Sequence, residues 1–180
     1  MPNPLRLALP ALLLAAAPAL AQDTAAESDA ERTIPSLIAQ VAGPDGADLG
    51  SVTAAFAPSG VTLLTLTLTG LAPGIHGIHI HEVGACEGPT FESAGGHLAG
   101  DREHGIMVEG GPHPGDLPNI HVLDSGAITL ELFAHDLTED MLTQGDGTAF
   151  IVHSAPDDYR GQPSGNAGDR VACGVFQPAE

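Results

Sequence analysis

Positive charge is what this chain of 180 residues most conspicuously lacks. It has no lysine and only five arginines, against 23 acidic residues, for a formal net charge of −18. Because nucleic acids and anionic membranes are bound through basic patches, this balance argues against both as partners. We interpret the acidic surface mainly as a source of solubility, and we note that it should repel an anionic ligand at long range.

Long apolar runs are missing beyond the N-terminal region. There, Arg6 is followed by an apolar stretch over 7–17 and by Ala-Leu-Ala at 19–21. This order is typical of a secretory signal peptide with a small-residue cleavage site. The stretch is too short for a retained membrane span, and no later segment is long enough to cross a membrane. We therefore expect a signal peptide over 1–21, cleaved near Ala21, and a periplasmic or secreted protein.

Cysteine is equally scarce, since Cys86 and Cys173 are the only two. In the oxidising compartment that export implies, such a pair favours one disulfide over a redox pair or a zinc knuckle. The segment 22–33 is acidic and lacks hydrophobic periodicity, so we expect a disordered leader. Residues 34–180 are enough for one domain with a hydrophobic core.

Short β-like runs separated by turn residues are abundant. Leucine and threonine alternate from Leu64 to Thr69, as in a strand with one buried face. One helical turn is expected over 137–142, with Thr138 as its N-cap. The pattern predicts an all-β fold, an eight-stranded Greek-key β-sandwich or flattened barrel. The expected strands cover 34–41, 49–56, 61–69, 75–83, 120–123, 127–133, 148–153 and 171–176.

Two long segments without strand-like runs, 84–119 and 154–170, interrupt this series of short strands and turns, and the first is rich in histidine. Long loops in compact domains are usually functional or disordered, and the histidines favour function. Just before the first loop, His79 and His81 share one face of an expected strand. Neutral imidazole is the commonest protein ligand for copper and zinc, so the pair indicates a metal site. Further candidate ligands are His97, His104, His113, Asp116 and His153.

From about residue 34 to 177, the sequence resembles the copper/zinc superoxide dismutases. The resemblance depends on six ordered blocks, of which the last is specific by itself. They are GIHGIHIHEVGAC (74–86), SAGGH (93–97), HG (104–105), GPHPGDLPN (111–119), IVH (151–153) and GNAGDRVACGV (165–175). His121 and His135 fall outside these blocks and are interpreted as surface residues, and His76 as a buried hydrogen-bonding residue near the site.

The resemblance implies a site with one copper and one zinc ion per chain. The implied copper ligands are His79, His81, His97 and His153, and the implied zinc ligands are His97, His104, His113 and Asp116. His97 would bridge the two metals. Such donor sets suit tetragonal copper(II) with an open position and four-coordinate zinc. Asp157 matches the carboxylate that joins a copper ligand to a zinc ligand.

The resemblance also implies that Cys86 and Cys173 form the disulfide and that Arg170 holds a small anion beside copper. The implied activity is dismutation of superoxide to O₂ and H₂O₂, with Arg170 and His97 as catalytic residues. Two alternatives remain open: a related protein that binds copper or zinc without turnover, and a catalytically inactive structural domain. The sequence does not distinguish a monomer from a homodimer, and it names neither the source of superoxide nor the copper donor.

Overall fold

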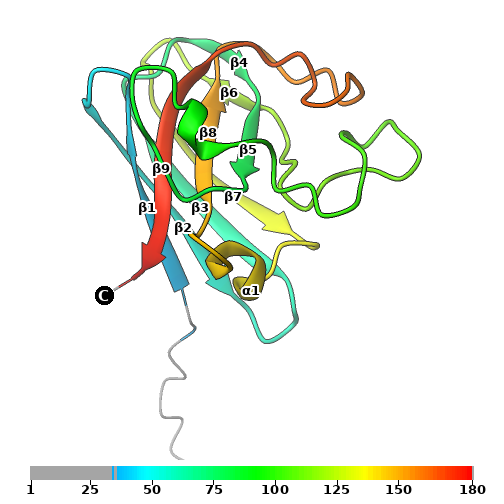
Figure 1. The fold of residues 1–180 in the computed structure, drawn as a ribbon. Coiled ribbons are helices and arrows are strands. Elements are labelled where there is room, and N and C mark those ends of the chain that lie inside the picture. The colour runs from blue at the N-terminus through cyan, green and yellow to red at the C-terminus, as the bar shows by residue number, and fades with distance from the viewer. Residues whose placement is uncertain (1–33, 35, 180) are drawn as a thin grey trace, which may run out of the picture. The chain divides into compact units, whose positions relative to one another are not determined.

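The computed structural model describes residues 34 and 36–179, so the expected signal peptide and acidic leader lie outside the described residues. Nine strands make up nearly all of the regular structure: β1 (Ser36–Ala42), β2 (Asp48–Phe56), β3 (Thr62–Leu68), β4 (Gly74–His76), β5 (Ile78–His81), β6 (Ile120–Val122), β7 (Ile128–Ala134), β8 (Ala149–His153) and β9 (Arg170–Pro178). The remaining regular elements of the described residues are one short α-helix, α1 (Glu139–Thr143), and one 3-10 turn, η1 (Glu92–Ala94). The predicted all-β architecture is confirmed (Figure 1).

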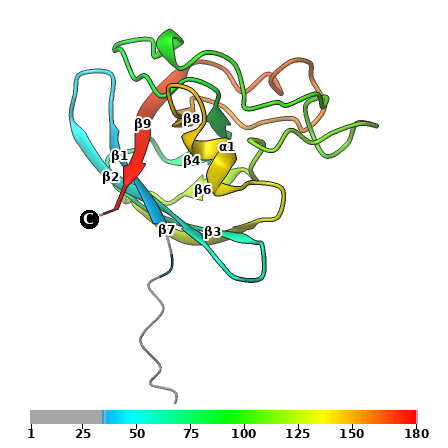
Figure 2. The ribbon, with the colours of Figure 1, turned by 60° about the horizontal axis from the view of Figure 1, so that its bottom comes forward.

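Seven strands form one antiparallel sheet in the order β5-β8-β9-β1-β2-β3-β7, and β4 pairs with β6 in a second, two-stranded sheet. Three neighbouring pairs of the large sheet, β5–β8, β9–β1 and β3–β7, are not consecutive in sequence, as Greek-key connections require. The large sheet curls strongly, as Figures 1 and 2 show. Its concave side holds the hydrophobic core.

Gly77 divides the strand that the sequence predicts over 75–83. Its N–H donates to the Ala155 carbonyl (2.9 Å) and its carbonyl accepts from the N–H of His153 (2.8 Å), so it interrupts the strand pairing. A Cβ at this position would lie 3.0 Å from the Cβ of Ala167, a tight contact that would push the β8–β9 loop away from this point. The break lets β4 pair with β6 while β5 pairs with β8.

The alternation expected for β3 is observed. Leu64, Leu66 and Leu68 are fully buried, while Thr65 and Thr67 point outward. Each buried leucine contributes about 1.5–3 kcal/mol relative to an exposed one. The core therefore depends on period-two patterning of the kind visible in the sequence.

The predicted helical turn is also present. Thr138 is the N-cap of α1, and its side chain accepts a hydrogen bond from the N–H of Met141 at 3.3 Å. Within the described residues, no helix has the length and apolar character needed to span a membrane.

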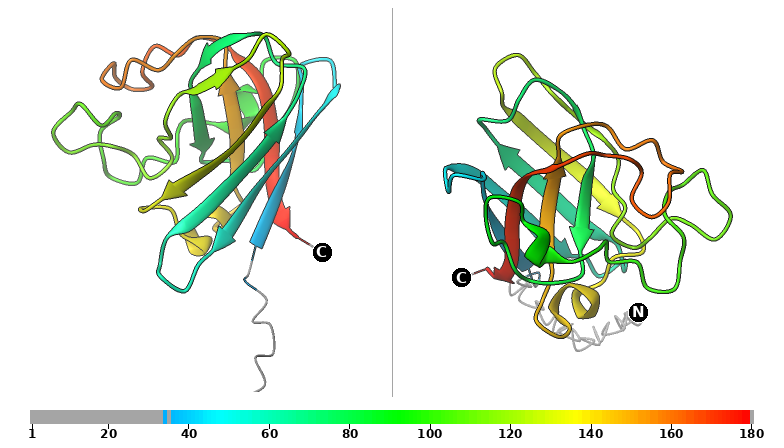
Figure 3. Two further views of the ribbon diagram at one scale, coloured as in Figure 1. Left: turned by 180° about the vertical axis from the view of Figure 1, so that it is seen from behind. Right: turned by 45° about the horizontal axis from the view of Figure 1, so that its top comes forward.

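Two long loops connect β5 to β6 (82–119) and β8 to β9 (154–169). They lie on the same side of the large sheet in Figure 1, where they are green and orange, and in the reversed view of Figure 3. Hydrogen bonds join them, for example from the N–H of His104 to Gln162 Oε1 (3.0 Å) and from Asn119 Nδ2 to the Asp157 carbonyl (2.9 Å). Both loops therefore cover the outer face of β5 and β8.

Candidate metal centre

Strand β5 places two histidines on the outer face of the sheet. Ile78 and Ile80 belong to the main hydrophobic core, so His79 and His81 take the opposite face. β8 is the antiparallel neighbour of β5 and ends at His153, on the side of the sheet that the loops cover. All three imidazoles are buried, because the loops close over them.

The free edge of β5 brings in two more candidate ligands. His97 lies opposite His81 and Asp116 lies opposite His79, each as an isolated β-bridge. Ile80 makes the backbone hydrogen bonds that hold both. Its carbonyl accepts from the N–H just after His97 (2.8 Å), and its N–H donates to the carbonyl just before Asp116 (2.9 Å). Two distant parts of the loop are thus aligned on one strand.

Four histidines form the first donor group, with one donor atom from each within 4.8 Å of the others. In each ring one nitrogen contacts a protein oxygen at 2.8–3.2 Å. The other is buried and has no hydrogen-bond partner among residues 34 and 36–179. A buried polar atom without a partner costs about 1–3 kcal/mol, so four in one small volume fit the ligands of a cation. These atoms are His79 Nδ1, His81 Nε2, His97 Nε2 and His153 Nε2.

The partners of the other ring nitrogens determine where each lone pair lies. A carbonyl only accepts, so Nδ1 of His81 donates to Gly95 O (3.0 Å) and Nδ1 of His153 donates to Gly168 O (3.2 Å). A neutral imidazole has one N–H, and Nε2 of both rings therefore carries the free lone pair. In His79 the two ring nitrogens have the opposite roles. Its Nε2 faces a carboxylate oxygen at 2.8 Å, and its Nδ1 carries the free lone pair. Each unpartnered nitrogen is thus the one able to bind a metal.

Burial keeps three of these imidazoles in the neutral, metal-binding form. It lowers the pKa of His79 to about 4, that of His81 to about 2 and that of His153 to about 3. Repulsion between neighbouring imidazoles acts in the same direction. At neutral pH the three rings carry no proton on the nitrogen that faces the group.

A second donor group surrounds Asp116. Its Oδ1 lies 3.0 Å from Nδ1 of His97, 3.0 Å from Nδ1 of His104 and 3.2 Å from Nδ1 of His113. Its Oδ2 accepts the backbone N–H of Gly105 (2.8 Å) and of His113 (3.0 Å), which holds the carboxylate in place. Burial raises the pKa of Asp116, but the hydrogen bonds from His97 and Gly105 and the nearby imidazoles outweigh it and hold that pKa well below its usual range.

The donors that lie within 4.8 Å of one another in this second group are His79, His97, His104 and Asp116. His113, which the sequence predicts as a ligand, is not among them, although its Nδ1 contacts the same carboxylate oxygen.

Asp157 joins the two groups from the β8–β9 loop. Its Oδ2 lies 2.8 Å from Nε2 of His79 and its Oδ1 lies 3.0 Å from Nε2 of His104. Burial opposes ionisation, yet hydrogen bonds from His79, the Tyr159 N–H and His104 lower the pKa of Asp157 to about 2. If the N–H of His104 points to Asp157, its Nδ1 lone pair faces an oxygen of Asp116. That arrangement is favourable when a cation lies between them.

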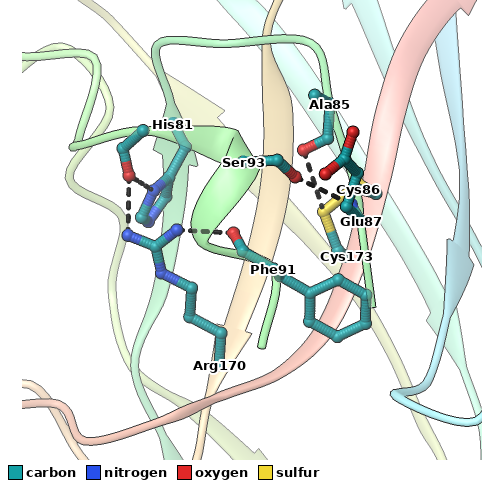
Figure 4. The surroundings of a disulfide bond; sticks show 9 residues. His81, Ala85, Cys86, Glu87, Phe91, Ser93, Arg170 and Cys173 are labelled. Carbon is teal, nitrogen blue, oxygen red and sulfur yellow. Dashed lines mark hydrogen bonds between the residues drawn. A yellow bond between two sulfur atoms is a disulfide. The ribbon is translucent and has the colours of Figure 1, made fainter. Parts of the chain in front are cut away.

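Arg170 begins β9 and reaches back to the loop beside the first group (Figure 4). Its Nη1 donates to the Phe91 carbonyl (2.5 Å) and its Nη2 to the Gly95 carbonyl (2.6 Å), which also accepts from His81. Burial lowers the pKa of Arg170 and the charge of Glu92 opposes the shift, but a guanidinium stays protonated at neutral pH. The residue lines a cavity of about 410 Å³ together with Pro89, Thr90, Glu92, Gly168 and Asp169.

Cys86 and Cys173 form the disulfide that the sequence predicts, with their Cα atoms 5.7 Å apart. The bond ties the β5–β6 loop to β9, three residues beyond Arg170 (Figure 4). Phe91 and Ile151 pack with Cys173 in a small second hydrophobic cluster. The loop that supplies the Gly95 carbonyl is therefore anchored to the sheet.

The structure gathers all seven predicted donors and Asp157 in one buried cluster, with Arg170 beside it. His76 is buried, as predicted, with its ring nitrogens 2.7 Å from the His153 carbonyl and 2.8 Å from the Ala72 carbonyl. His121 and His135 are exposed. Sequence reasoning missed the carbonyls that orient the rings and the contacts of Asn119, Gln162 and Tyr159. Only Asn119 carried a signal, as the last residue of the GPHPGDLPN block.

The sequence of this chain is similar to those of known metal-binding enzymes. The sequence model of the family "Copper/zinc superoxide dismutase (SODC)" matches residues 49–176. A protein of Caulobacter vibrioides named superoxide dismutase [Cu-Zn] is 43% identical over 150 residues, which cover 79% of this chain and 86% of that protein.

Two solved structures share the fold. A superoxide-dismutase-like protein from Bacillus subtilis has a TM-score of 0.74 and 33% identity, over 78% of this chain and 97% of the other. The Cu/Zn superoxide dismutase from Brucella abortus has a TM-score of 0.66 and 29% identity, over 79% and 99%. With the family match over most of the domain, these similarities show that the chain belongs to the copper/zinc superoxide dismutase family.

Proposed function

We propose that this protein is a superoxide dismutase that binds one copper and one zinc ion per chain. The observation that carries the proposal is the set of four buried, unpartnered ring nitrogens beside the second group around Asp116. Membership of the copper/zinc superoxide dismutase family supports the same conclusion.

The first group would hold copper. Four neutral imidazoles suit tetragonal copper(II), and the lone pairs of His79, His81 and His153 lie on the atoms that face the group. The second group would hold zinc, for which three imidazoles and one carboxylate make a suitable four-coordinate set.

We assign His113, rather than His79, as the fourth zinc ligand. The free lone pair of His79 is on the unpartnered Nδ1, and its Nε2 is hydrogen-bonded to Asp157. His113 instead directs Nδ1 to the oxygen of Asp116 that His97 and His104 also approach. The zinc ligands would thus be His97, His104, His113 and Asp116.

His97 is the residue that we propose to bridge both metals. Its Nδ1 contacts Asp116 in the second group, and its Nε2 is one of the unpartnered atoms of the first group. Two nitrogens of one ring therefore serve two groups. Nε2 is also the atom at which His97 can take up a proton during the reaction and return it.

Copper, which alternates between two oxidation states, would supply the electron transfer that converts two superoxide ions and two protons into O₂ and H₂O₂. Arg170 would hold the anion, because its guanidinium and the ring of His81 in the first group share the Gly95 carbonyl, and the residue lines a cavity. The bonds from Arg170 to two backbone carbonyls fix its position before the anion arrives. The carbonyl of Gly95 thereby connects Arg170 and His81.

Binding of metals without turnover is the alternative, and the Bacillus subtilis structure is described as superoxide-dismutase-like. Arg170 favours turnover in this chain, because its guanidinium lies beside the first group, where it can bind an anionic substrate, and metal storage needs no such residue. We also propose that residues 1–21 direct export, that 22–33 form a leader and that 34–180 form the catalytic domain outside the cytoplasm. The predicted cleavage site and the disulfide support this proposal.

Metal analysis and a dismutation assay on the same sample test the function, with His97→Ala as the variant. We expect about one copper and one zinc per parent chain, together with dismutation activity. His97→Ala should bind both metals more weakly, because it removes a shared ligand. His121→Ala, a substitution of an exposed histidine on β6, is the matched control and should leave both contents unchanged. A parent protein that takes up zinc but never copper would overturn the assignment.

A further inference from the structure

Two side-chain amides, one from each long loop, bind the backbone of the opposite loop in the same way. Asn119, at the end of the β5–β6 loop, contacts Asp157 twice: its Oδ1 accepts the Asp157 N–H (2.8 Å) and its Nδ2 donates to the Asp157 carbonyl (2.9 Å). One amide thus satisfies both backbone groups of one residue, as a neighbouring strand would.

Gln162, in the β8–β9 loop, does the same to His104. Its Oε1 accepts the His104 N–H (3.0 Å) and its Nε2 donates to the His104 carbonyl (2.9 Å). We call each of these pairs of hydrogen bonds between a side-chain amide and one backbone residue a clasp. The two clasps are reciprocal, since each loop contributes one amide and has one residue bound by the amide of the other loop.

The two clasped residues are partners through their side chains, since Nε2 of His104 lies 3.0 Å from Oδ1 of Asp157. Gly165 covers this contact, because a Cβ there would lie 1.9 Å from Asp157 Oδ1 and 2.6 Å from His104 Nε2. Both residues lie in irregular loop segments rather than in strands. Their backbones need another source of rigidity, and the two amides provide it.

We propose that Asn119 and Gln162 are positioning residues that set the His104–Asp157 contact and, through it, the geometry of the second metal group. The proposal rests on the zinc site described above. Removal of a group that hydrogen-bonds to a metal ligand, without itself contacting the metal, commonly lowers metal affinity about 10- to 100-fold. Each clasp acts one step further away through the backbone, so we expect about a 10-fold effect or less.

Gln162→Met is the sharpest test. It keeps the length of the side chain, removes both hydrogen bonds to His104 and affects an exposed residue, so folding should be preserved. Gln177→Met, at an exposed position near the end of β9, is the matched control. Cobalt(II), a coloured substitute for zinc, is the probe, because its visible absorption bands report the arrangement of its ligands.

We expect Gln162→Met to shift the cobalt bands and to release cobalt several-fold faster to a chelator, while Gln177→Met matches the parent. Asn119→Ala should act in the same direction. The double variant should lose less than the sum of the two effects on a logarithmic scale, because both amides support one contact. If Asn119→Ala fails to fold, the Gln162→Met result decides alone.

Parent-like bands and release rates in Gln162→Met would overturn the positioning role. A lower melting temperature of the metal-free variant with unchanged bands would also overturn it, since that result describes a merely structural contact. A parent protein that binds no cobalt would instead refute the proposed zinc site, so the two failures are distinguishable.

Discussion

The acceptor behind each imidazole decides what that imidazole can do. The carbonyls of Gly95 and Gly168 and the carboxylate of Asp157 each take one N–H, which leaves the opposite nitrogen of the ring free. The carbonyl contacts have no side-chain signature and arise from the path of the loops. The identity of the histidines can therefore be read from the sequence, but their tautomers cannot.

Arg170 gives the most direct prediction for a single residue. Arg170→Ala should slow dismutation several-fold or more, because it removes the fixed charge at the cavity, while both metals stay bound. Arg170→Lys should recover part of the rate, since it restores the charge but not the planar fork that reaches two carbonyls. The measurement is the second-order rate by pulse radiolysis on samples matched for copper. A parent rate in the alanine variant would show that Arg170 does not guide the substrate.

Among the structural elements, the strands could be predicted and their interruptions could not. Alternation placed β3 and its neighbours within one or two residues, because period-two burial is a local property. The break at Gly77 depends on Ala155 and Ala167, more than seventy residues away in the sequence, and no local pattern reports such contacts. The same holds for the edge of β5, where Ile80 receives both loop segments.

Some features of the candidate site could likewise be predicted from the sequence, and others could not. The resemblance to the family implied which residues gather, and strand periodicity alone placed only His79 and His81 on one face. The amides of Asn119 and Gln162 act across two irregular loops, so neither periodicity nor motif spacing identifies their partners.

The disulfide gives a prediction for the loop that it anchors. Cys86 and Cys173 are 87 residues apart, and closing so long a loop is worth about 4 to 5 kcal/mol as an upper figure from chain entropy. Reduction, or replacement of both by alanine, should lower the melting temperature. It should also speed copper loss, because the released segment carries the Gly95 carbonyl that orients His81. Calorimetry and chelator release measure the two effects, and unchanged copper retention would contradict the link.

The pH dependence of the metal-free protein follows from the buried histidines taken together. Burial lowers the pKa of His79 to about 4, of His81 to about 2 and of His153 to about 3, so the unfolded chain binds protons first as the pH falls below about 6.5. Stability should be full above that pH and should decline below it, by up to about 2 kcal/mol per histidine at pH 5. The decline should end near pH 4 for His79, near pH 3 for His153 and near pH 2 for His81. Denaturant titrations at pH 7 and pH 5 measure this decline.

His81→Gln should weaken the pH dependence, because it removes one of the three titrating groups. Equal stability of the metal-free parent at both pH values would mean that the imidazoles are hydrated, and not buried, in that form.

The charge of the whole molecule leads to the last prediction. The net charge of −18 should repel superoxide at distance, and the cavity beside Arg170 adds the carboxylates of Glu92 and Asp169. Exposed charges act over about 30 Å at 0.01 M salt but only about 8 Å at 0.15 M. Within the shorter range, Arg170 and the bound metals should dominate. Raising the salt over this interval should therefore increase the dismutation rate, whereas a positively charged surface would produce a decrease.

The measurement is the second-order rate by pulse radiolysis at several concentrations of a salt whose anion does not bind copper. The double variant Glu92→Gln/Asp169→Asn removes two negative charges from the cavity and keeps the shape of both side chains. It should be faster than the parent at every salt concentration and should respond less to added salt. A parent rate that falls steeply with salt would show that local positive charge attracts superoxide even at long range, against the net charge of the chain.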